Sequence, residues 1–139
     1  MYRTKKLHSP TCKRPEYVII QISAADDGSV VLQKHDRAKV WKLPADIVGS
    51  SGKPFVAACS CLKRLGIQNI KNQRLELIRS TVREFNGVCS TVYVFRCIVD
   101  RNTINALEGR SGRDRTTRVF RRKEVHMYLT TRDFKLAFS

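Results

Sequence analysis

The stretch Trp41–Ile67, WKLPADIVGSSGKPFVAACSCLKRLGI, decides the fold of this chain. Its first residues predict a strand over Val40–Leu43, which Pro44 closes because proline cannot donate a hydrogen bond to a sheet. A loop rich in glycine and serine follows, and Pro54 suits the first turn of a helix, where a missing N–H does no harm. Gly66 ends that helix. Its apolar residues recur at the spacing of one buried helix face, at Phe55, Ala58, Cys59, Leu62 and Leu65.

Strands are predicted on both sides of this stretch. Upstream, apolar runs at residues 17–23 and 30–34 are joined by Asp26-Asp27-Gly28-Ser29, which predicts a type I′ hairpin. Downstream, residues 75–82 alternate in polarity and residues 88–99 are a long β-prone run, with the hairpin signal Asn86-Gly87 between them. This order predicts a single α/β domain over residues 16–139.

The last third of the chain has weaker signals. Residues 109–116 are basic, have no apolar period and predict a mobile loop. A short strand is predicted over residues 117–120 and a helix over residues 124–129. Thr131 is then expected to cap a final helical segment.

The central stretch resembles the Nudix box, the loop–helix signature of the Nudix hydrolases. The resemblance is carried by Trp41, Leu43-Pro44, the paired alanines Ala57-Ala58, Leu62 and the terminal Gly66-Ile67. The preceding order of strand, Asp-Gly turn and second strand ending in basic residues is also that of the family. The resemblance covers residues 16–138 and implies an α/β/α sandwich with a mixed central sheet.

The box lacks the residues that hold metal in the family, where glutamates on the helix bind the magnesium ions that bridge a substrate's pyrophosphate. When the alanines are matched, the glutamate positions hold Cys61, Arg64 and Leu65. When the terminal glycine is matched, they hold Ser60, Lys63 and Arg64. No carboxylate occurs between Asp46 and Glu76, whereas magnesium prefers carboxylate and phosphate oxygens. We therefore expect no metal, no cofactor, no catalytic residue and no enzyme activity.

The charge of the chain indicates the class of partner. It has 27 basic and 12 acidic residues, a formal net charge of +15, and such a field concentrates polyanions. Residues 1–15 carry five lysines and arginines and no acid, which predicts a basic arm. Arginine binds phosphate directly through its planar fork. We expect RNA or a ribonucleoprotein as partner, bound by Lys5, Lys6, Lys63, Arg64, Arg110, Arg113, Arg115, Arg121 and Arg122, with Trp41 as a candidate for stacking on a base.

Other interpretations remain open at this point. Lys63 and Arg64 also fit the solvated side of an amphipathic helix, and Trp41 fits a core residue. The chain could be a protein-interaction scaffold in a larger complex, with an acidic partner. It could also be a residual Nudix hydrolase of nucleoside diphosphate derivatives or capped RNA, if an acid from outside the helix restored the site. The acids available for that role are Asp46, Glu76, Glu84, Glu108 and Glu124.

The cysteines and the hydropathy indicate the compartment. Five cysteines without a CxxC pair predict free thiols in a reducing, intracellular compartment, the cytoplasm or nucleus. The basic, acid-free first 15 residues leave the mitochondrion open. No apolar run reaches the length of a membrane span, so we expect no membrane partner.

Overall fold

The computed structural model describes residues 15–50, 52–68, 74–112 and 114–138. The expected basic arm lies almost entirely outside these residues, as do Lys5, Lys6 and Arg113. None of the helices in the described ranges is long and apolar enough to span a membrane. In chain order, the elements are β1 (Glu16–Ala24), β2 (Val30–His35), β3 (Ala45–Ile47), α1 (Pro54–Leu65), β4 (Arg74–Phe85), β5 (Val88–Val99), α2 (Arg101–Leu107), β6 (Ser111–Gly112), β7 (Arg115–Phe120), the 3₁₀ turn η2 (Arg122–Glu124), α3 (Val125–Tyr128) and α4 (Thr131–Phe138).

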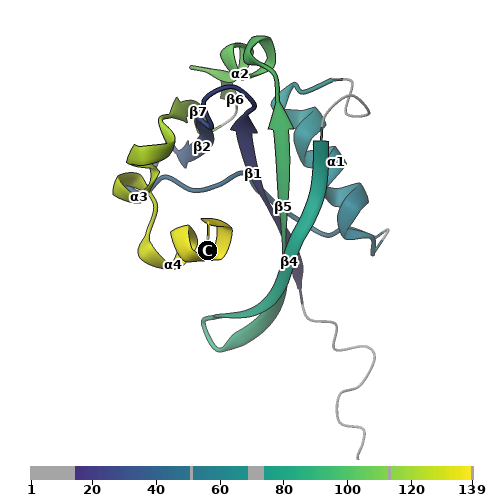
Figure 1. The fold of residues 1–139 in the computed structure, drawn as a ribbon. Helices are drawn as coiled ribbons and strands as arrows, with labels where there is room; N and C mark the ends of the chain where they lie inside the picture. Colours follow the sequence, from purple (N-terminus) through teal and green to yellow (C-terminus); the bar gives the residue numbers. More distant parts are fainter. Residues whose placement is uncertain (1–14, 51, 69–73, 113, 139) are drawn as a thin grey trace, which may run out of the picture.

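The strands form one mixed sheet in the order β4-β5-β1-β2-β7-β6, with β3 paired to β1. β1 lies at its centre (Figure 1), parallel to β5 along its whole length. On its other side β1 pairs antiparallel with β3 through residues 17–19 and with β2 near its end. The nearly continuous apolar character of β1 follows from this position, because both of its faces are covered.

Helices cover the two faces of the sheet, as Figure 1 shows. Val18, Ile20 and Ile22 of β1 lie in one core cluster with side chains of α1 and α2. On the opposite face, Val30 and Leu32 of β2 lie in a second cluster with side chains of α3 and α4. Successive side chains of a strand point to opposite faces, so one sheet supplies both clusters. The expected α/β/α sandwich with a mixed central sheet is confirmed.

Helix α1 begins and ends where the sequence predicts. Pro54 occupies its first turn, and Gly66 follows it in the left-handed region at φ 98°. The N–H of Gly66 donates to the Lys63 carbonyl at 2.9 Å, and that of Ile67 donates to the Leu62 carbonyl at 3.0 Å. These two bonds form a Schellman motif, in which the apolar residue after the glycine packs back on the helix. Ile67 and Leu62 share the α1 core cluster accordingly.

The buried face of α1 differs from the predicted face. Phe55 is more than half exposed, with its ring edge-on to Phe95 at a centroid distance of 6.3 Å. Cys59 is only partly buried. Ala57 and Cys61 are buried in place of these two side chains, while Ala58, Leu62 and Leu65 are buried as predicted. The buried residues are Ala57, Ala58, Cys61, Leu62 and Leu65.

The predicted strand over Val40–Leu43 is wrong. This segment makes a single bridge, between Lys42 and Gln33, and the strand of this region is β3, which begins after Pro44. Pro44 enters the sheet as an acceptor, since its carbonyl receives the N–H of Ile20 at 2.9 Å. The proline thus precedes the paired segment, in a position where its missing N–H costs nothing.

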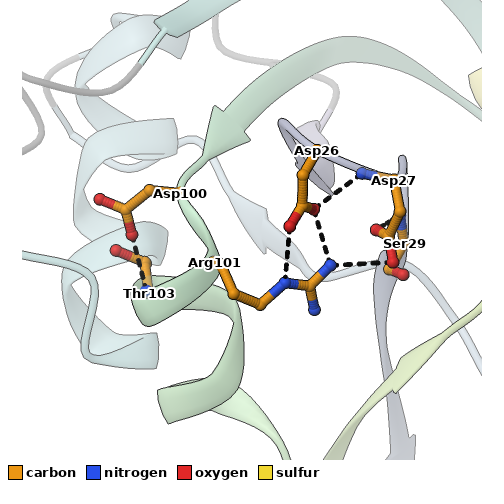
Figure 2. A network of polar contacts seen from close by, with 6 residues as sticks. All are labelled: Asp26, Asp27, Ser29, Asp100, Arg101 and Thr103. Atoms are coloured by element: carbon orange, nitrogen blue, oxygen red, sulfur yellow. Dashed lines mark hydrogen bonds and ion pairs between the residues drawn. The ribbon is translucent and has the colours of Figure 1, made fainter.

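The turn between β1 and β2 is longer than the predicted type I′ hairpin. Gly28 has a positive φ of 74° but Asp27 does not, and the N–H of Ala24 donates to the Ser29 carbonyl across the turn. An arginine at the start of α2 holds this turn (Figure 2). Arg101 donates to both carboxylate oxygens of Asp26, at 2.9 and 2.7 Å, and its Nη2 lies 2.8 Å from Asp27.

Hydrogen bonds to these carboxylates lower their pKa values. The side chain of Asp27 accepts the Ser29 N–H at 2.9 Å, and its pKa falls to about 2. The bond from Arg101 lowers the pKa of Asp26 as well. Both carboxylates are therefore charged at neutral pH. Their ion pairs with Arg101 join the β1–β2 turn to the start of α2.

Residues 101–116 are more regular than predicted. Helix α2 was not predicted; Asp100 caps it by accepting the Thr103 N–H at 2.8 Å. The expected mobile loop over residues 109–116 is instead a hairpin of β6 and β7, in which Asp114 takes a positive φ of 63°. Aspartate tolerates that conformation in turns. At the last helix the cap is Thr130 rather than Thr131, since its hydroxyl accepts the Asp133 N–H at 3.1 Å.

The burial of α1 gives a test of the fold. Leu62 is fully buried, so Leu62→Ala should leave a cavity and lower the free energy of unfolding by ~2–5 kcal/mol. Lys63 is exposed, and Lys63→Ala should stay within ~0.5 kcal/mol. Urea unfolding followed by circular dichroism measures both values. Similar losses in the two variants would show that the helix packs through a different face.

Candidate nucleic-acid interface

A cleft of about 540 Å³ opens beside the C-terminal half of α1. Its walls come from α1, β2, β3 and the β6–β7 hairpin, so elements from three separate parts of the chain meet there. Arginine is the most frequent residue in the lining, which comprises Gln33, His35, Ala45, Asp46, Cys61, Arg64, Leu65, Arg110, Gly112, Asp114, Arg115 and Thr117.

The position of this cleft distinguishes the two alignments of the Nudix box. Cys61, Arg64 and Leu65, the positions obtained by matching the alanines, all line the cleft. Ser60 and Lys63, which come from matching the glycine, are exposed and do not line it. The helix side that lines the cleft presents a thiol, a guanidinium and an isobutyl group.

Arg64 forms an ion pair with Asp46 of β3. The Asp46 carboxylate also accepts the N–H of Ile47 at 2.8 Å, so its two oxygens are both engaged. The Arg64 side chain remains mostly exposed. A guanidinium has five N–H donors, and one contact with a carboxylate leaves others for a ligand.

Arg110 lies against the C-terminus of α1. A Cβ added to Gly66 would meet its Nη1 at 2.3 Å, so the guanidinium occupies the space that the glycine leaves. The backbone fixes this arginine, because the Thr117 N–H donates to the Arg110 carbonyl at 2.9 Å. A cation at the C-terminal end of a helix interacts favourably with the negative end of the helix dipole.

Arg115 projects from the first position of β7, opposite His35 of β2. It lies close enough to Cys61 to affect the thiol electrostatically. Burial nevertheless raises the pKa of the Cys61 thiol to about 11, and Arg115 offsets only part of that rise. Cys61 is thus a neutral wall of the cleft at physiological pH, and it is not an activated nucleophile.

Arg110 and Arg115 share the cleft lining with Asp46 and Asp114 but form no ion pair with either. Among the described residues, no carboxylate lies within ion-pair distance of either guanidinium. By contrast, Arg101 is paired with Asp26 and Asp27, and Arg118 lies 3.8 Å from Glu108. The cleft therefore holds two arginines whose charge the protein does not neutralise.

The cleft does not fit the magnesium ions that the Nudix resemblance implies. Asp46 is held by Arg64, and the other acid of the lining, Asp114, is exposed on the hairpin turn. The described part of the chain contains no group of three histidine, cysteine, aspartate or glutamate side chains that could hold a metal ion. The cationic N–H donors in the lining, those of Arg64, Arg110 and Arg115, suit an anion.

The remaining candidates lie elsewhere. Arg122 stacks over the rings of Phe138 and Phe134 at 4.3 and 5.4 Å, on the α4 side of the sheet. Arg121 is exposed beside η2 and does not line the cleft. Trp41 packs edge-on against Phe120 at 5.0 Å, within the second core cluster, so it is not placed for base stacking in the cleft.

Three polar residues of the cleft were missed by sequence reasoning. Gln33 and His35 lie on β2, and Thr117 lies on β7 opposite Gln33. The Gln33 Nε2 donates to the Thr117 hydroxyl at 3.1 Å, which joins the two strands at the base of the cleft. The alternation of β2 was visible in the sequence, but its pairing with β7 was not.

The contact between Arg110 and Gly66 gives a second test. Gly66→Ala should lower the free energy of unfolding by about 1–2 kcal/mol, because alanine is strained at this positive φ. The added methyl group also clashes with Arg110, so the substitution should cost less in an Arg110→Ala background than in wild type.

Gly49→Ala is the matched control, since its surroundings are open and its φ is not positive; it should change stability by less than ~0.5 kcal/mol. Urea unfolding of all four variants measures these differences. An equal cost of Gly66→Ala with and without Arg110 would mean that the guanidinium does not pack there in solution.

Comparison with known proteins identifies the fold. No protein-family model matches the sequence, and no curated protein matches it. The solved structure of the Escherichia coli dihydroneopterin triphosphate pyrophosphohydrolase matches with a TM-score of 0.71 at 15% identity, over 90% of this chain and 92% of that one. The NUDIX domain of Shewanella oneidensis NrtR, solved with ADP ribose, matches with 0.69 at 9% identity, over 94% and 90%.

A third match is the Ap4A hydrolase of Caenorhabditis elegans, with a TM-score of 0.62 at 11% identity, over 84% of this chain and 86% of that one. At such low identity the likeness concerns the fold alone. It confirms the Nudix-like α/β/α fold that the Trp41–Ile67 stretch predicts.

Proposed function

We propose, from the Nudix fold of this chain, that it is a catalytically inactive Nudix-like domain that binds RNA without a metal ion. The observation that carries the proposal is the pair Arg110 and Arg115. Both line a cleft at the helix of the Nudix box, and neither has a carboxylate partner within the described residues. In this proposal their guanidinium groups take the phosphate contacts that metal ions make in the family.

The geometry of the hairpin suits two neighbouring phosphates. Arg110 precedes β6 and Arg115 begins β7, so a single antiparallel hairpin presents both side chains to the same cleft. Backbone bonds hold both strands, which reduces the conformational entropy lost when a ligand orders the site. The planar fork of arginine donates two parallel hydrogen bonds to one phosphate.

Arg64 supports the site indirectly in this proposal. Its ion pair neutralises Asp46, which would otherwise repel a phosphate at the floor of the cleft. Its exposed donors extend the cationic wall along α1. Helix α1 thus contributes Arg64 to the cleft, with one contact to Asp46 and its other donors exposed. Lys63 lies outside the cleft and contributes only to the net positive charge.

The overall charge favours a polyanion over a small ligand. The net charge of +15 includes exposed cations outside the cleft, among them Arg121 and Lys123 beside η2. Such cations attract an extended phosphate backbone from solution and raise its rate of association. A mononucleotide would use the cleft alone, whereas an extended polyanion also experiences this wider positive field.

A salt titration tests RNA binding. Affinity for a random single-stranded RNA, measured by fluorescence anisotropy, should fall linearly on a log–log plot of binding constant against salt. Arg110→Ala with Arg115→Ala should weaken binding and flatten the slope by about 1.4, because each phosphate contact on a single strand contributes about −0.7. Arg110→Lys with Arg115→Lys should keep the slope and lose part of the affinity, since lysine lacks the fork.

The matched control is Arg121→Ala with Lys123→Ala, which removes the same two charges outside the cleft and should weaken binding less. If both double variants lost the same affinity for RNA, the cleft would not be a specific binding site, and binding would depend on the net positive charge alone. Binding that neither double variant changes would favour the alternative of a scaffold with an acidic protein partner.

Inactivity is tested by turnover assays. With magnesium or manganese present, ADP-ribose, dinucleoside polyphosphates and capped RNA should show no cleavage above a protein-free blank. The physical reason is the lack of free carboxylates at Cys61, Arg64 and Leu65, where metals would have to be fixed over the phosphates. Metal-dependent turnover that disappears in Asp46→Ala, with the melting temperature unchanged, would establish the residual hydrolase instead.

A further inference from the structure

The outer strand of the sheet, β4, carries a surface that the proposed RNA cleft does not use. Among the described strands β4 is at one end of the sheet order and pairs only with β5. Figure 1 shows the β4–β5 hairpin projecting beyond the body of the sheet. With 12 residues, β4 is about 40 Å long, and it contains neither proline nor lysine, two residues that commonly protect an edge strand. We propose that β4 pairs antiparallel with β4 of a second copy of this chain.

The backbone of β4 is ready for such pairing. Asn86 and Gly87 both have positive φ and form the two-residue type I′ turn, so Phe85 and Val88 are the pair that closes the hairpin. Hydrogen bonding alternates along an antiparallel ladder. The backbone N–H and C=O groups of Glu84, Val82 and Ser80 therefore point away from β5. The Glu84 carbonyl confirms this direction, because it accepts a bond from Arg132 of α4 at 3.4 Å. That contact marks the end of the free edge and leaves the middle of β4 open.

A bulge in β4 sets which side chains share a face. The register against β5 shifts between Leu77 and Arg79, so Ile78 is the extra residue. Leu77 and Val82 consequently lie on the same face as α1, since they pair with Phe95 and Thr91 of β5. Because Ile78 is left out of the alternation, the strand from Leu77 to Val82 has five positions whose side chains alternate between the two faces. Ser80 is the middle position.

This spacing makes the strand self-complementary. A two-fold axis through Ser80 places Leu77 of each copy opposite Val82 of the other, on the α1 face. These side chains are 53% and 62% exposed, and Phe55 continues the apolar row next to them. On the opposite face Arg83 is held within its own copy, 2.9 Å from Asp133 of α4. The pair of Leu77 with Val82 occurs twice on the α1 face, and Ser80 lies opposite Ser80 of the second copy on the axis.

The second copy is favoured as occupant because one two-fold axis gives both exposed apolar side chains of β4, Leu77 and Val82, an apolar partner at once. An unrelated strand would need to supply two apolar residues at the same spacing, whereas a second β4 supplies them by symmetry. Two copies carry +15 each, so their long-range repulsion opposes association and is screened by salt. The dimer should therefore strengthen with salt, the reverse of the trend expected for RNA binding, and the two proposals can fail separately.

The test is sedimentation velocity of the full chain over a range of protein and salt concentrations. Wild type should show a monomer–dimer equilibrium that shifts to dimer with added salt. Val82→Lys places a charge opposite Leu77 and should raise the dissociation constant about two- to thirtyfold, since the symmetric dimer loses two cross-strand pairs. Val88→Lys is the matched control: it adds the same charge at an exposed valine of the same hairpin, on β5, and should leave the dimer intact.

A mixing experiment fixes the register. Leu77→Glu alone should also be monomeric. When mixed with Val82→Lys it should form a heterodimer, held by an ion pair between the two introduced side chains and by one unchanged pair of Leu77 with Val82. Within one copy these two positions are about 13 Å apart and cannot pair with each other. Three results would overturn the proposal: a wild-type monomer at high salt and the highest soluble concentration, equal effects of Val82→Lys and Val88→Lys, or no heterodimer on mixing.

Discussion

The pairing of β1 with β5 is the constraint on which the rest of this molecule depends. β1 is bonded along one side to a parallel strand and along the other to β3 and β2, and both of its faces are covered by helices. A strand in that position has no freedom of register, because a shift by one residue would turn every apolar side chain to the wrong face. The neighbours of β1 are fixed in turn. β3 pairs with its first half, and α1 packs on its even-numbered side chains, so two walls of the cleft are anchored to the same strand.

Helix α1 serves both the fold and the cleft. Ala57, Ala58 and Leu62 hold it to the sheet, and Gly66 ends it through backbone bonds that need no side chain. Cys61 and Leu65 belong to the core and also line the cleft, whereas Arg64 is mostly exposed and contributes to the cleft alone. A substitution at position 64 can therefore change the chemistry of the cleft while the packing against the sheet is kept.

The cations of the chain fall into distinct groups once their neighbours in space are known. Arg101 and Arg118 are paired with acids, and Arg122 lies over aromatic rings, so these three serve the protein itself. Arg64 is paired but largely exposed. Arg110 and Arg115 line the cleft without an ion pair among the described residues, so their charge is available to an anionic ligand. A net charge therefore indicates a class of partner, while the distribution of ion pairs indicates where that partner can bind.

The sequence by itself determined the elements that depend on local chemistry. Pro54 and Gly66 bounded α1 because proline suits a first turn and glycine accepts a left-handed end, and Asn86-Gly87 placed the β4–β5 hairpin for the same kind of reason. The absence of acids between Asp46 and Glu76 is likewise a property of the sequence alone. The strand at Val40–Leu43, the buried face of α1 and the order in residues 109–116 were misjudged, because each depends on which distant strand lies alongside. Only the tertiary structure could bring Arg110 and Arg115 to Arg64, pack Trp41 against the second core cluster and place Arg122 over the aromatic rings of α4. Those relations come from sheet pairing between residues far apart in the chain, and no local pattern encodes them.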